Sequence, residues 1–276
     1  MKYVLVTGAN GGMGRAAVRT LTAMGFGVFA LDQRWETEAT DENVIPLQVD
    51  ITDETAVRQA AERVGQITKE LYAIVHYAGI YRLNSLVEIS FEEFALAFRV
   101  NVFGAFLVNR TFCPFLRPGS RIVMTTSELA PLDPLPFTGL YAVTKASLDK
   151  YAYALRMELQ LLDVSVSVIR AGAVKTGMLG VSTGELEKFQ ADTRLYSYNA
   201  ERFRRIVDRV EAKSVRPEKI AALTGKILQK RNPKFVYSIN RNPLLLLLHA
   251  LPKRMQLFVI RRILKEPKQE PKKREC

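Results

Sequence analysis

The feature that most constrains the fold is a short apolar strand that runs directly into a glycine-rich turn. Val4 to Val6 precede Thr7-Gly8-Ala9-Asn10-Gly11-Gly12-Met13-Gly14, and a segment of helical spacing begins at Gly14. Glycine lets the backbone turn tightly and approach a phosphate, while the N–H groups at a helix start face the anion. The pattern predicts a dinucleotide-binding turn. Methyltransferases and plain turns also use glycine here, so the turn alone leaves those alternatives open.

Strand-like and helix-like segments alternate along most of the chain. The short, β-branched runs that we predict as strands are Val4–Val6, Val28–Leu31, Val44–Val49, Ala73–Val75, Arg121–Thr125 and Val164–Ile169. The segments of helical length between them are Gly14–Met24, Thr55–Ile67, Phe91–Phe115 and Tyr141–Leu161. This alternation predicts a parallel sheet with helices on both faces. From residue 176 to 215 the periodicity weakens, and we expect a helical lobe over an active site.

Polar or small residues follow several predicted strands, at the edge of the sheet where a cofactor would bind. Asp32 ends the second strand, where its carboxylate can accept hydrogen bonds from an adenosine ribose and would repel a 2′-phosphate. This favours NAD, although Arg34 could pair with the phosphate of NADP. Asp50 ends the third strand, and Ala78-Gly79 follows the fourth. The alternative for Asp50 is a helix N-terminal residue stabilised by the helix dipole.

Tyr141 and Lys145 lie four residues apart, which on a helix places both side chains on one face. We expect the ammonium to lower the pKa of the phenol from about 10 toward working pH. Such a phenol can exchange a proton with a carbonyl or alcohol oxygen while a hydride moves to or from nicotinamide. The spacing alone is common on solvated helix faces, so its meaning depends on the residues around it.

Two further polar residues fit the same chemistry. Ser127 stands just past the fifth strand, where its hydroxyl can bond the same substrate oxygen, although alone it would be a turn residue. Asn101 is an amide inside an apolar helical stretch. A buried amide needs hydrogen-bond partners and can hold a water, and a purely structural bond explains it equally well.

Taken in order, these residues closely resemble the short-chain dehydrogenase/reductase family: Thr7-Gly8-x-x-x-Gly12-x-Gly14, Asp50, Ala78-Gly79, Asn101, Ser127 and Tyr141-x-x-x-Lys145. The resemblance covers residues 1 to about 176. It implies an α/β fold: a single Rossmann domain, with a doubly wound parallel sheet flanked by helices. We place this domain at 1–240, with its substrate-binding lobe at 176–215 and a basic amphipathic tail at 241–276.

The resemblance also implies the role of each catalytic residue. Ser127 would polarise the substrate oxygen, Tyr141 would transfer the proton, and Lys145 would hold the nicotinamide ribose. Asn101 would anchor a proton-relay water. NAD is the implied cofactor, because Gly11 stands where the family usually carries a basic residue that helps to bind NADP. The implied cofactor-binding residues are Gly8, Asn10, Gly11, Gly12, Met13, Gly14, Asp32, Gln33, Asp50, Ile51, Ala78, Gly79, Tyr141, Lys145, Val174 and Thr176.

The chain departs from the family pattern in three places. The family's Asn-Asn-Ala-Gly appears as His76-Tyr77-Ala78-Gly79, and its Pro-Gly as Ala171-Gly172. Neither change touches the proton chemistry. The loop at 128–140 is one residue longer than usual and mostly apolar, which favours a lipophilic substrate, although packing of the loop would also explain it.

The C-terminal region is strongly basic. Of the net charge of +12, residues 241–276 contribute +7 from ten Lys/Arg and three Glu, which leaves +5 for the rest. On a helical wheel one arc holds Met255, Leu257, Val259, Ile260, Ile263 and Leu264, and the opposite arc holds Arg254, Arg261, Arg262 and Lys265. Such a helix is typical of peripheral attachment to an anionic membrane. A dimer contact or packing on the body are the alternatives.

Composition sets the remaining expectations. The N-terminal strand meets glycine too early for a signal peptide, and the longest apolar run, Leu244 to Leu248, is too short to span a membrane. Two cysteines and two histidines predict neither a disulfide framework nor a metal site. We therefore expect a cytoplasmic protein, peripheral on a membrane at most, that binds no nucleic acid because its body is only mildly basic. Family resemblance further implies a homo-oligomer.

The predicted function is NAD-linked interconversion of a secondary alcohol and a ketone, on a lipophilic substrate such as a hydroxysteroid. A 3-oxoacyl-(acyl carrier protein) reductase and a sugar or polyol dehydrogenase are enzyme alternatives. From another class, a binding protein that senses NAD would keep the fold and lose the chemistry.

Overall fold

The computed structural model describes residues 1–35, 41–211 and 213–265. Seven parallel strands form one sheet in the order β3-β2-β1-β4-β5-β6-β7. Their bounds are β1 Lys2–Thr7, β2 Phe26–Asp32, β3 Val44–Gln48, β4 Leu71–His76, β5 Leu116–Ser127, β6 Ser165–Ala171 and β7 Val236–Ile239. The six predicted strands and the α/β class are confirmed. The prediction missed β7, a four-residue edge strand without a fully buried residue, because so short a run carries little periodicity.

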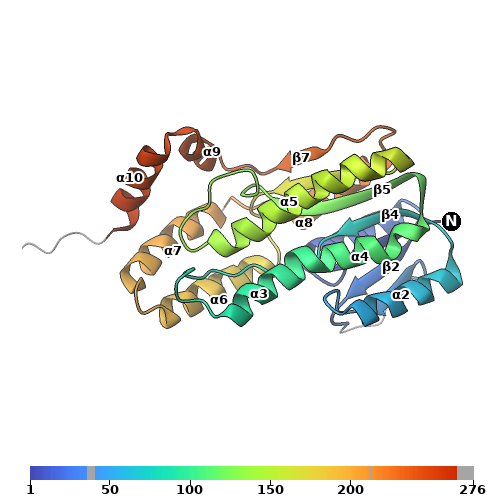
Figure 1. Cartoon of the computed structure of the whole chain (residues 1–276), viewed down its shortest axis with the longest axis horizontal. Coiled ribbons are helices and arrows are strands. Elements are labelled where there is room, and N and C mark those ends of the chain that lie inside the picture. Colours follow the sequence, from blue (N-terminus) through green and yellow to red (C-terminus); the bar gives the residue numbers. More distant parts are fainter. Residues whose placement is uncertain (36–40, 212, 266–276) are drawn as a thin grey trace, which may run out of the picture.

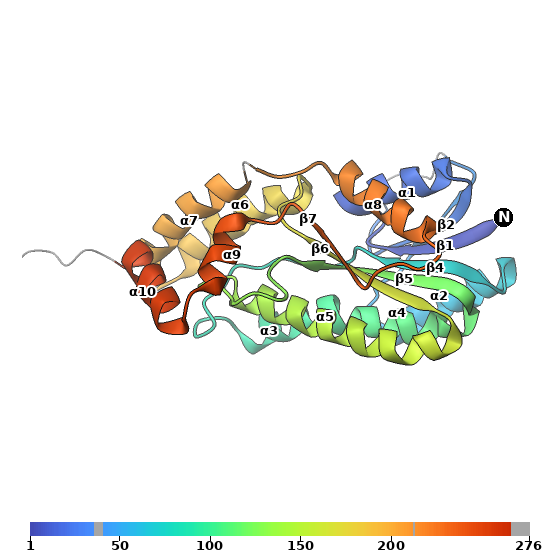
Figure 2. The ribbon, with the colours of Figure 1, turned by 90° about the horizontal axis from the view of Figure 1, so that it is seen from above.

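Helices cover both faces of the sheet, as predicted (Figure 2). On one face lie α2 (Glu54–Ile67), α4 (Gly104–Phe112) and α5 (Gly139–Leu159), and on the other α1 (Gly12–Ala23) and α8 (Pro217–Gln229). Their small and branched residues pack against the buried faces of the strands in two separate apolar clusters. Because every strand is parallel, the carboxyl ends of β1, β2, β4, β5 and β6 meet at one edge, and this edge positions the site.

The segment predicted as one helix over Phe91–Phe115 is interrupted. It divides into α3 (Phe91–Phe98), a π-helical turn at Arg99–Phe103, α4, and a 3₁₀ turn at Cys113–Phe115. The apolar sequence gives no sign of the interruption, which coincides with the buried amide of Asn101. π-turns occur mostly as single turns and are frequent at functional sites.

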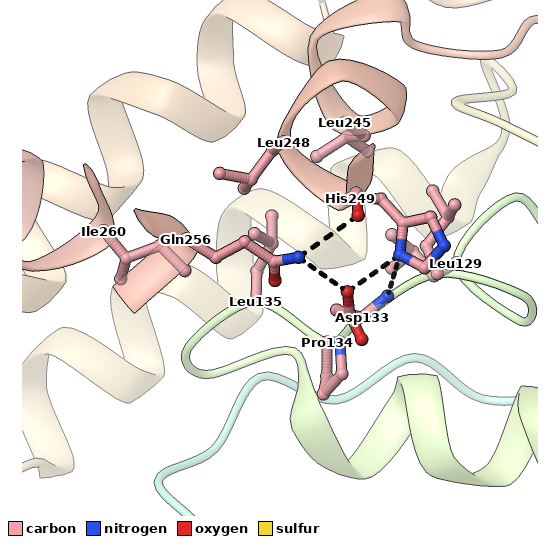
Figure 3. Close-up of a pocket in the computed structure, with 10 residues that line it drawn as sticks. Leu129, Asp133, Pro134, Leu135, Leu245, Leu248, His249, Gln256 and Ile260 are labelled. Carbon is pink, nitrogen blue, oxygen red and sulfur yellow. Dashed lines mark hydrogen bonds and ion pairs between the residues drawn. The ribbon is translucent and has the colours of Figure 1, made fainter. Parts of the chain in front are cut away.

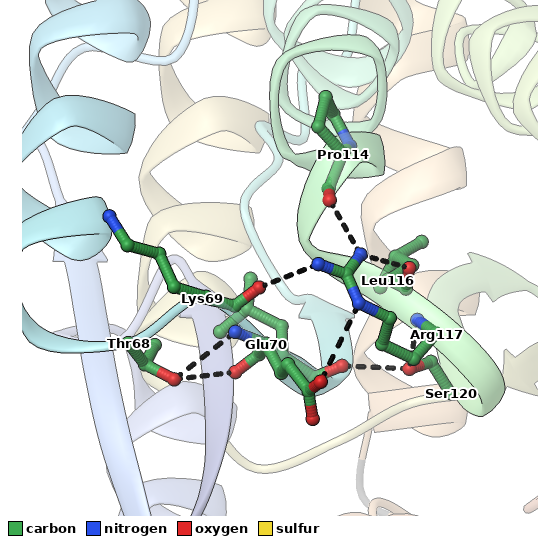
Figure 4. A network of polar contacts seen from close by, with 8 residues as sticks. Thr68, Lys69, Glu70, Pro114, Leu116, Arg117 and Ser120 are labelled. Atoms are coloured by element: carbon green, nitrogen blue, oxygen red, sulfur yellow. Dashed lines mark hydrogen bonds and ion pairs between the residues drawn. The ribbon is translucent and has the colours of Figure 1, made fainter.

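Polar contacts fix the opposite end of the sheet, where β4 and β5 begin (Figure 4). Arg117 donates to the carbonyl oxygens of Lys69, Pro114 and Leu116 at 3.2, 2.8 and 2.9 Å. The hydroxyl of Ser120 accepts from Arg117 N and donates to Leu71 O. The register between β4 and β5 shifts here, and these contacts satisfy the backbone groups that the irregular pairing leaves free.

Beyond the carboxyl ends of the strands lies a helical lobe, as predicted for residues 176–215. It consists of α6 (Gly177–Asp192) and α7 (Ser197–Glu211). Leu186, Phe189, Ala200 and Phe203 are buried together with Leu83 in a third apolar cluster. Glu88 ties the lobe to the body, because its carboxylate accepts from Thr193 Oγ1 and from the backbone N–H groups of Arg194 and Leu195.

The C-terminal segment continues into α9 (Pro243–Ala250) and α10 (Lys253–Leu264), at the end of the long axis opposite the N-terminus (Figures 1 and 2). The predicted amphipathic helix is therefore present, but its apolar arc is only partly used for packing. Gln256 is buried in the middle of that arc, and Leu264 is buried beside the lobe. Within the described residues no helix is both long and apolar enough to cross a bilayer. The predicted domain boundaries at residues 240 and 241 stay predictions.

Candidate active site

The glycine-rich turn joins β1 to α1 and brings three strand ends together without room for side chains. Gly8 has a positive φ of +66°, and a Cβ there would lie 2.5 Å from Ala78 N beyond β4. A Cβ on Gly12 would lie 2.8 Å from the Cβ of Thr176 beyond β6, and one on Gly14 only 2.0 Å from Gly8 O. Gly11 precedes α1, and its N–H bonds to Gly8 O at 3.1 Å. This cradle, which side chains would fill, fits the pyrophosphate of a dinucleotide.

The predicted adenosine-binding residues gather at the ends of β2 and β3. Asn10 N donates to Asp32 Oδ2 at 2.8 Å, and Asn10 Nδ2 donates to Arg34 O at 2.7 Å. Gln33 Nε2 reaches Asp50 Oδ2 at 3.3 Å. The carboxylate of Asp32 thus lies directly beside the turn, where a ribose could reach its remaining lone pairs.

The alternative role considered for Asp50, as a helix N-terminal residue, is wrong. Asp53 is the N-cap of α2 and accepts from the N–H groups of Thr55 and Ala56. Asp50 instead closes a turn, because its Oδ1 accepts from Thr52 N at 2.9 Å and Thr52 Oγ1 at 2.8 Å. This turn holds the carboxylate at the strand end.

Ser127 and Tyr141 form the centre of the site. Ser127 ends β5 and is buried, and Tyr141 lies in the first turn of α5. Burial raises the pKa of Tyr141 to about 12, and the hydrogen bond with Ser127 acts in the opposite direction. The ring of Tyr81 packs edge-on against Tyr141, with 4.8 Å between the centroids. The phenol is therefore protonated at neutral pH and able to donate.

Lys145 lies one helical turn after Tyr141, as predicted, and is buried. Its Nζ donates to Thr125 O at 3.2 Å and lies 5.7 Å from the ring centroid of Tyr141. Burial lowers the pKa of Lys145 to about 8. The expectation that the ammonium lowers the pKa of Tyr141 is not met in this structure, because burial of the phenol raises this pKa and only the hydrogen bond with Ser127 opposes it, while Lys145 donates to a backbone carbonyl.

Asn101 is held inside the molecule by three hydrogen bonds to protein groups. Its Oδ1 accepts from Ile80 N at 2.8 Å, and its Nδ2 donates to Ile80 O and Thr144 Oγ1 at 2.9 and 3.0 Å. A Cβ on Gly79 would lie 3.1 Å from Asn101 Oδ1 and 3.3 Å from Lys145 Nζ. The structure therefore brings Asn101 and Lys145 together at Gly79. The hydrogen bonds of Asn101 are of the structural kind that the sequence analysis gave as the alternative to a bound water.

The remaining predicted cofactor residues line the same edge. Val174 is buried, and its segment pairs with Val215. Thr176 follows at the contact with Gly12. Ile51 is buried after β3 against Gly104, and Met13 packs on the cluster below α1.

Sequence reasoning missed a buried hydrogen-bond chain behind the site. His76 Nε2 lies 2.9 Å from Asn109 Oδ1, and His76 Nδ1 lies 3.4 Å from Thr7 Oγ1. Because an amide oxygen only accepts, the ring carries its proton on Nε2. Asn109 Nδ2 in turn donates to Tyr151 Oη. The one sign of this hydrogen-bond chain in the sequence was that His76 replaces the family's asparagine. The partners of His76, Thr7 and Asn109, could not be predicted because they lie on elements that are distant in the chain.

Aromatic side chains pack between the lobe and the loop that leads to Tyr141. Phe137, four residues before Tyr141, adopts a positive φ of +66°. Its ring lies 4.7 to 5.5 Å, centroid to centroid, from those of Phe189, Tyr196 and Phe203 in the lobe. A bulky residue in the left-handed region is strained, and these ring contacts hold it there.

The fold and the glycine-rich turn together define a protein of the Rossmann-like α/β class. A family profile described as short chain dehydrogenase matches residues 2–187. The mouse (Mus musculus) estradiol 17-beta-dehydrogenase 2 is 32% identical over 191 residues, which are 65% of this chain and 50% of that protein. The chain thus corresponds to only half the length of that relative.

Two further comparisons extend over nearly the whole chain. The 3-ketodihydrosphingosine reductase of Bacteroides thetaiotaomicron is 26% identical over 274 residues, 94% of this chain and 97% of that protein. The crystal structure of a short chain dehydrogenase from Burkholderia cenocepacia in complex with NADP has a TM-score of 0.71 at 20% identity, and covers 97% of this chain and 100% of that one. The protein belongs to the short-chain dehydrogenase family, whose members use NAD or NADP to oxidise or reduce small molecules.

The buried His76 makes stability depend on pH. Burial lowers its pKa to about 4. Between pH 6.5 and 4 the unfolded chain therefore binds more protons than the folded protein, and the free energy of unfolding decreases as the pH is lowered. The full window of 2.5 pH units corresponds to about 3 kcal/mol. We expect the stability difference between wild type and His76→Asn to narrow by about 2–3 kcal/mol between pH 7 and pH 4.5. Urea denaturation at both values measures it. A constant difference would contradict the neutral, buried assignment.

Proposed function

We propose that this protein interconverts a secondary alcohol and a ketone with NAD(H), and that Tyr141 is the acid/base. The observation that carries the proposal is the Tyr141 phenol, hydrogen-bonded to Ser127, beside Lys145 and Asn101 at the edge of the glycine cradle. A methyltransferase would need the cradle but not this set of side chains.

Each residue of the site has its own role in the proposed reaction. Ser127 donates to and polarises the substrate oxygen, and Tyr141, protonated at neutral pH, gives its proton to that oxygen as the ketone is reduced. In the reverse direction Lys145 stabilises the phenolate as a nearby cation. Asn101 orients the proton path behind them. When bound, the nicotinamide supplies or accepts the hydride.

The cofactor would lie across the strand ends. Gly8, Gly11, Gly12 and Gly14 would hold the pyrophosphate, and Asp32 the adenosine ribose. NAD is the proposed cofactor because the Asp32 carboxylate lies beside the turn. Arg15, which donates to Asn10 Oδ1 at 2.9 Å, and the exposed Arg34 are the cations that would favour NADP.

The substrate is proposed to be lipophilic, and a hydroxysteroid is the first candidate. The aromatic cluster of Phe137, Phe189, Tyr196 and Phe203, between the lobe and the loop that leads to Tyr141, supports this. A long-chain keto lipid of the 3-ketodihydrosphingosine kind is the second candidate, favoured because that relative matches nearly the whole chain, including the C-terminal helices. The name estradiol 17-beta-dehydrogenase 2 belongs to a protein that this chain matches over half its length only.

We also propose that the protein is a cytoplasmic homo-oligomer attached peripherally to a membrane. The neighbouring helices α4 and α5, joined by the Phe106–Tyr151 ring contact, carry exposed apolar side chains that suit a second copy. Among them are Phe106, Tyr153 and Met157, which are 43 to 50% exposed. Light scattering in solution tests the assembly.

Replacing Tyr141 by Phe removes the exchangeable proton and should lower turnover by about 10²–10⁴-fold, while NAD(H) binding is unchanged. The assay uses hydroxysteroids and their ketones, 3-ketodihydrosphingosine, 3-oxoacyl thioesters and polyols, each with NAD(H) and NADP(H). Tyr153→Phe removes a hydroxyl from an exposed position of the same helix and serves as the control. Retained activity of Tyr141→Phe would refute the mechanism, and NAD(H) binding without turnover of any compound would favour the sensing protein.

Asp32→Asn keeps a hydrogen-bond acceptor for Asn10 N but removes the charge beside the ribose site. Without that repulsion the ratio of kcat/KM for NADP to that for NAD should rise about tenfold, which corresponds to about 1.4 kcal/mol. Steady-state kinetics with both cofactors measures the ratio, with Asp53→Asn, at the N-cap of α2, as the matched control. An unchanged ratio, or a wild type that prefers NADP, would contradict the proposed NAD selectivity.

A further inference from the structure

The C-terminal hairpin, defined here as α9 and α10 with their connecting residues (241–265), is entirely cationic among its charged groups. Its basic residues are Arg241, Lys253, Arg254, Arg261, Arg262 and Lys265, and it contains no Asp or Glu. All six are exposed. Because the hairpin lies at one end of the long axis, the charge is concentrated at one pole of the molecule (Figure 1).

The same hairpin exposes large apolar side chains. Leu257 is 68% exposed and Phe258 69%, next to Arg261 and Arg262 one turn later. Met255 on α10, and Leu244 and Leu247 on α9, are 51 to 69% exposed. Gln256 and Leu264 turn inward instead, so the outward side of α10 alternates apolar side chains with cations.

We propose that the exposed side of the C-terminal hairpin binds the surface of an anionic lipid bilayer. Apolar side chains flanked by arginine and lysine match an interface in which acyl chains lie beneath negative headgroups. The proposal names the surface and the lipid chemistry of the peripheral attachment suggested above. It is tested by binding alone, so it stands or falls separately from the proposed reaction.

A groove of about 350 Å³ between α7 and α10 extends this surface. It is lined by Tyr198, Glu201, Arg202, Arg205, Ile206 and Ile263. Arg205 pairs with Glu201 at 2.6 Å, and Arg202 donates to Tyr198 Oη at 3.2 Å. The two arginines and one glutamate leave a net charge of +1 beside the exposed Ile263, which suits a lipid phosphate next to its acyl chain.

A polar cluster fastens the hairpin to the loop that leads to the catalytic tyrosine (Figure 3). Asp133 of this loop forms an ion pair with Lys253, and its Oδ2 lies 2.8 Å from His249 Nδ1. The buried Gln256 Nε2 lies 3.0 Å from Asp133 Oδ2, 3.2 Å from His249 O and 2.8 Å from Leu251 O. Lys253, Gln256 and His249 hold the pKa of Asp133 at about 2, so its charge persists at any physiological pH.

Apolar contacts and a second carboxylate complete the attachment. Around Asp133, the side chains of Leu129, Leu132 and Leu135 from the loop face Leu245, Leu248 and Ile260 from the hairpin. The buried Glu128, next to Ser127, accepts from Asn242 N at 2.6 Å. A bilayer that holds the hairpin would therefore also hold the loop between Ser127 and Tyr141. Asp133 is a positioning residue in this arrangement, and the site would draw its substrate from molecules dissolved in the membrane.

The test is sedimentation of the full chain with vesicles of phosphatidylcholine containing 30% phosphatidylglycerol, and with pure phosphatidylcholine. We expect binding to the anionic vesicles that is at least about tenfold tighter than to the neutral ones and that weakens in high salt. Leu257→Asp/Phe258→Asp and Arg261→Glu/Arg262→Glu should each weaken it at least about tenfold. If the first variant does not fold, as judged by circular dichroism, the second decides.

Matched controls make the same changes elsewhere. Leu161→Asp/Leu162→Asp alters two adjacent, exposed leucines after α5, and Arg58→Glu/Arg63→Glu alters two exposed arginines of α2. Both should bind like wild type. The proposal is overturned if wild type ignores the anionic vesicles, if it binds both kinds equally, or if the controls lose as much binding as the hairpin variants. It is equally overturned if the hairpin variants only dissociate an oligomer, which would make this surface a contact between copies.

Hydrogen exchange tests the role of Asp133. Anionic vesicles should slow exchange of the amides at 129–138 in wild type, and Asp133→Ala should bind the vesicles equally but lose most of that protection. Equal protection in the variant would show that Asp133 does not transmit membrane contact to the loop.

Discussion

The close approach of the glycine-rich turn to the ends of neighbouring strands is the constraint on which the rest of the structure depends. The backbone at Gly8 touches Ala78 beyond β4, Gly12 touches Thr176 beyond β6, and Gly14 lies over Gly8 itself. Any side chain at these points would separate the strand ends. Because the strand ends stay together, Ser127 at the end of β5 and Asp32 at the end of β2 belong to one site, although they are far apart in the chain.

Burial then sets the protonation states in this site. The same desolvation that raises the pKa of Tyr141 lowers those of Lys145 and His76, so each group is held toward its neutral form. His76 is neutral at pH 7 and needs no buried counter-ion, since its described partners are an amide and a hydroxyl, while Lys145 donates to a backbone carbonyl. Carboxylates are paired with cations both inside and outside: the buried Asp149 pairs with Arg170 at 2.7 Å, and Asp133 pairs with the exposed Lys253.

The sheet and much of the site could be predicted from local sequence, because buried parallel strands are continuous apolar runs and the turn and tyrosine motifs are contiguous. What escaped prediction depends on distant contacts. Asn101 was recognisable as a buried amide, but not that Ile80 and Thr144 would satisfy it. Gln256 could not be identified as a buried anchor in the middle of an apolar arc without knowing that Asp133 faces it. The short β7 forms only because β6 provides an edge to pair with.

The π-turn at Arg99–Phe103 has a consequence for how the two halves of its helix are related. A π-turn accommodates one extra residue, and an ordinary helix advances by about 100° per residue. The buried faces of α3 and α4 therefore point in different directions than they would in one regular helix. As a result α3 packs against α5, while α4 packs against α2 and presents Ala105, Val108 and Phe112 to the core. Deleting one residue here would restore a regular helix and turn one of the two halves away from its partner. A change of length here would therefore disturb both the packing of the two halves and the position of the buried Asn101 amide.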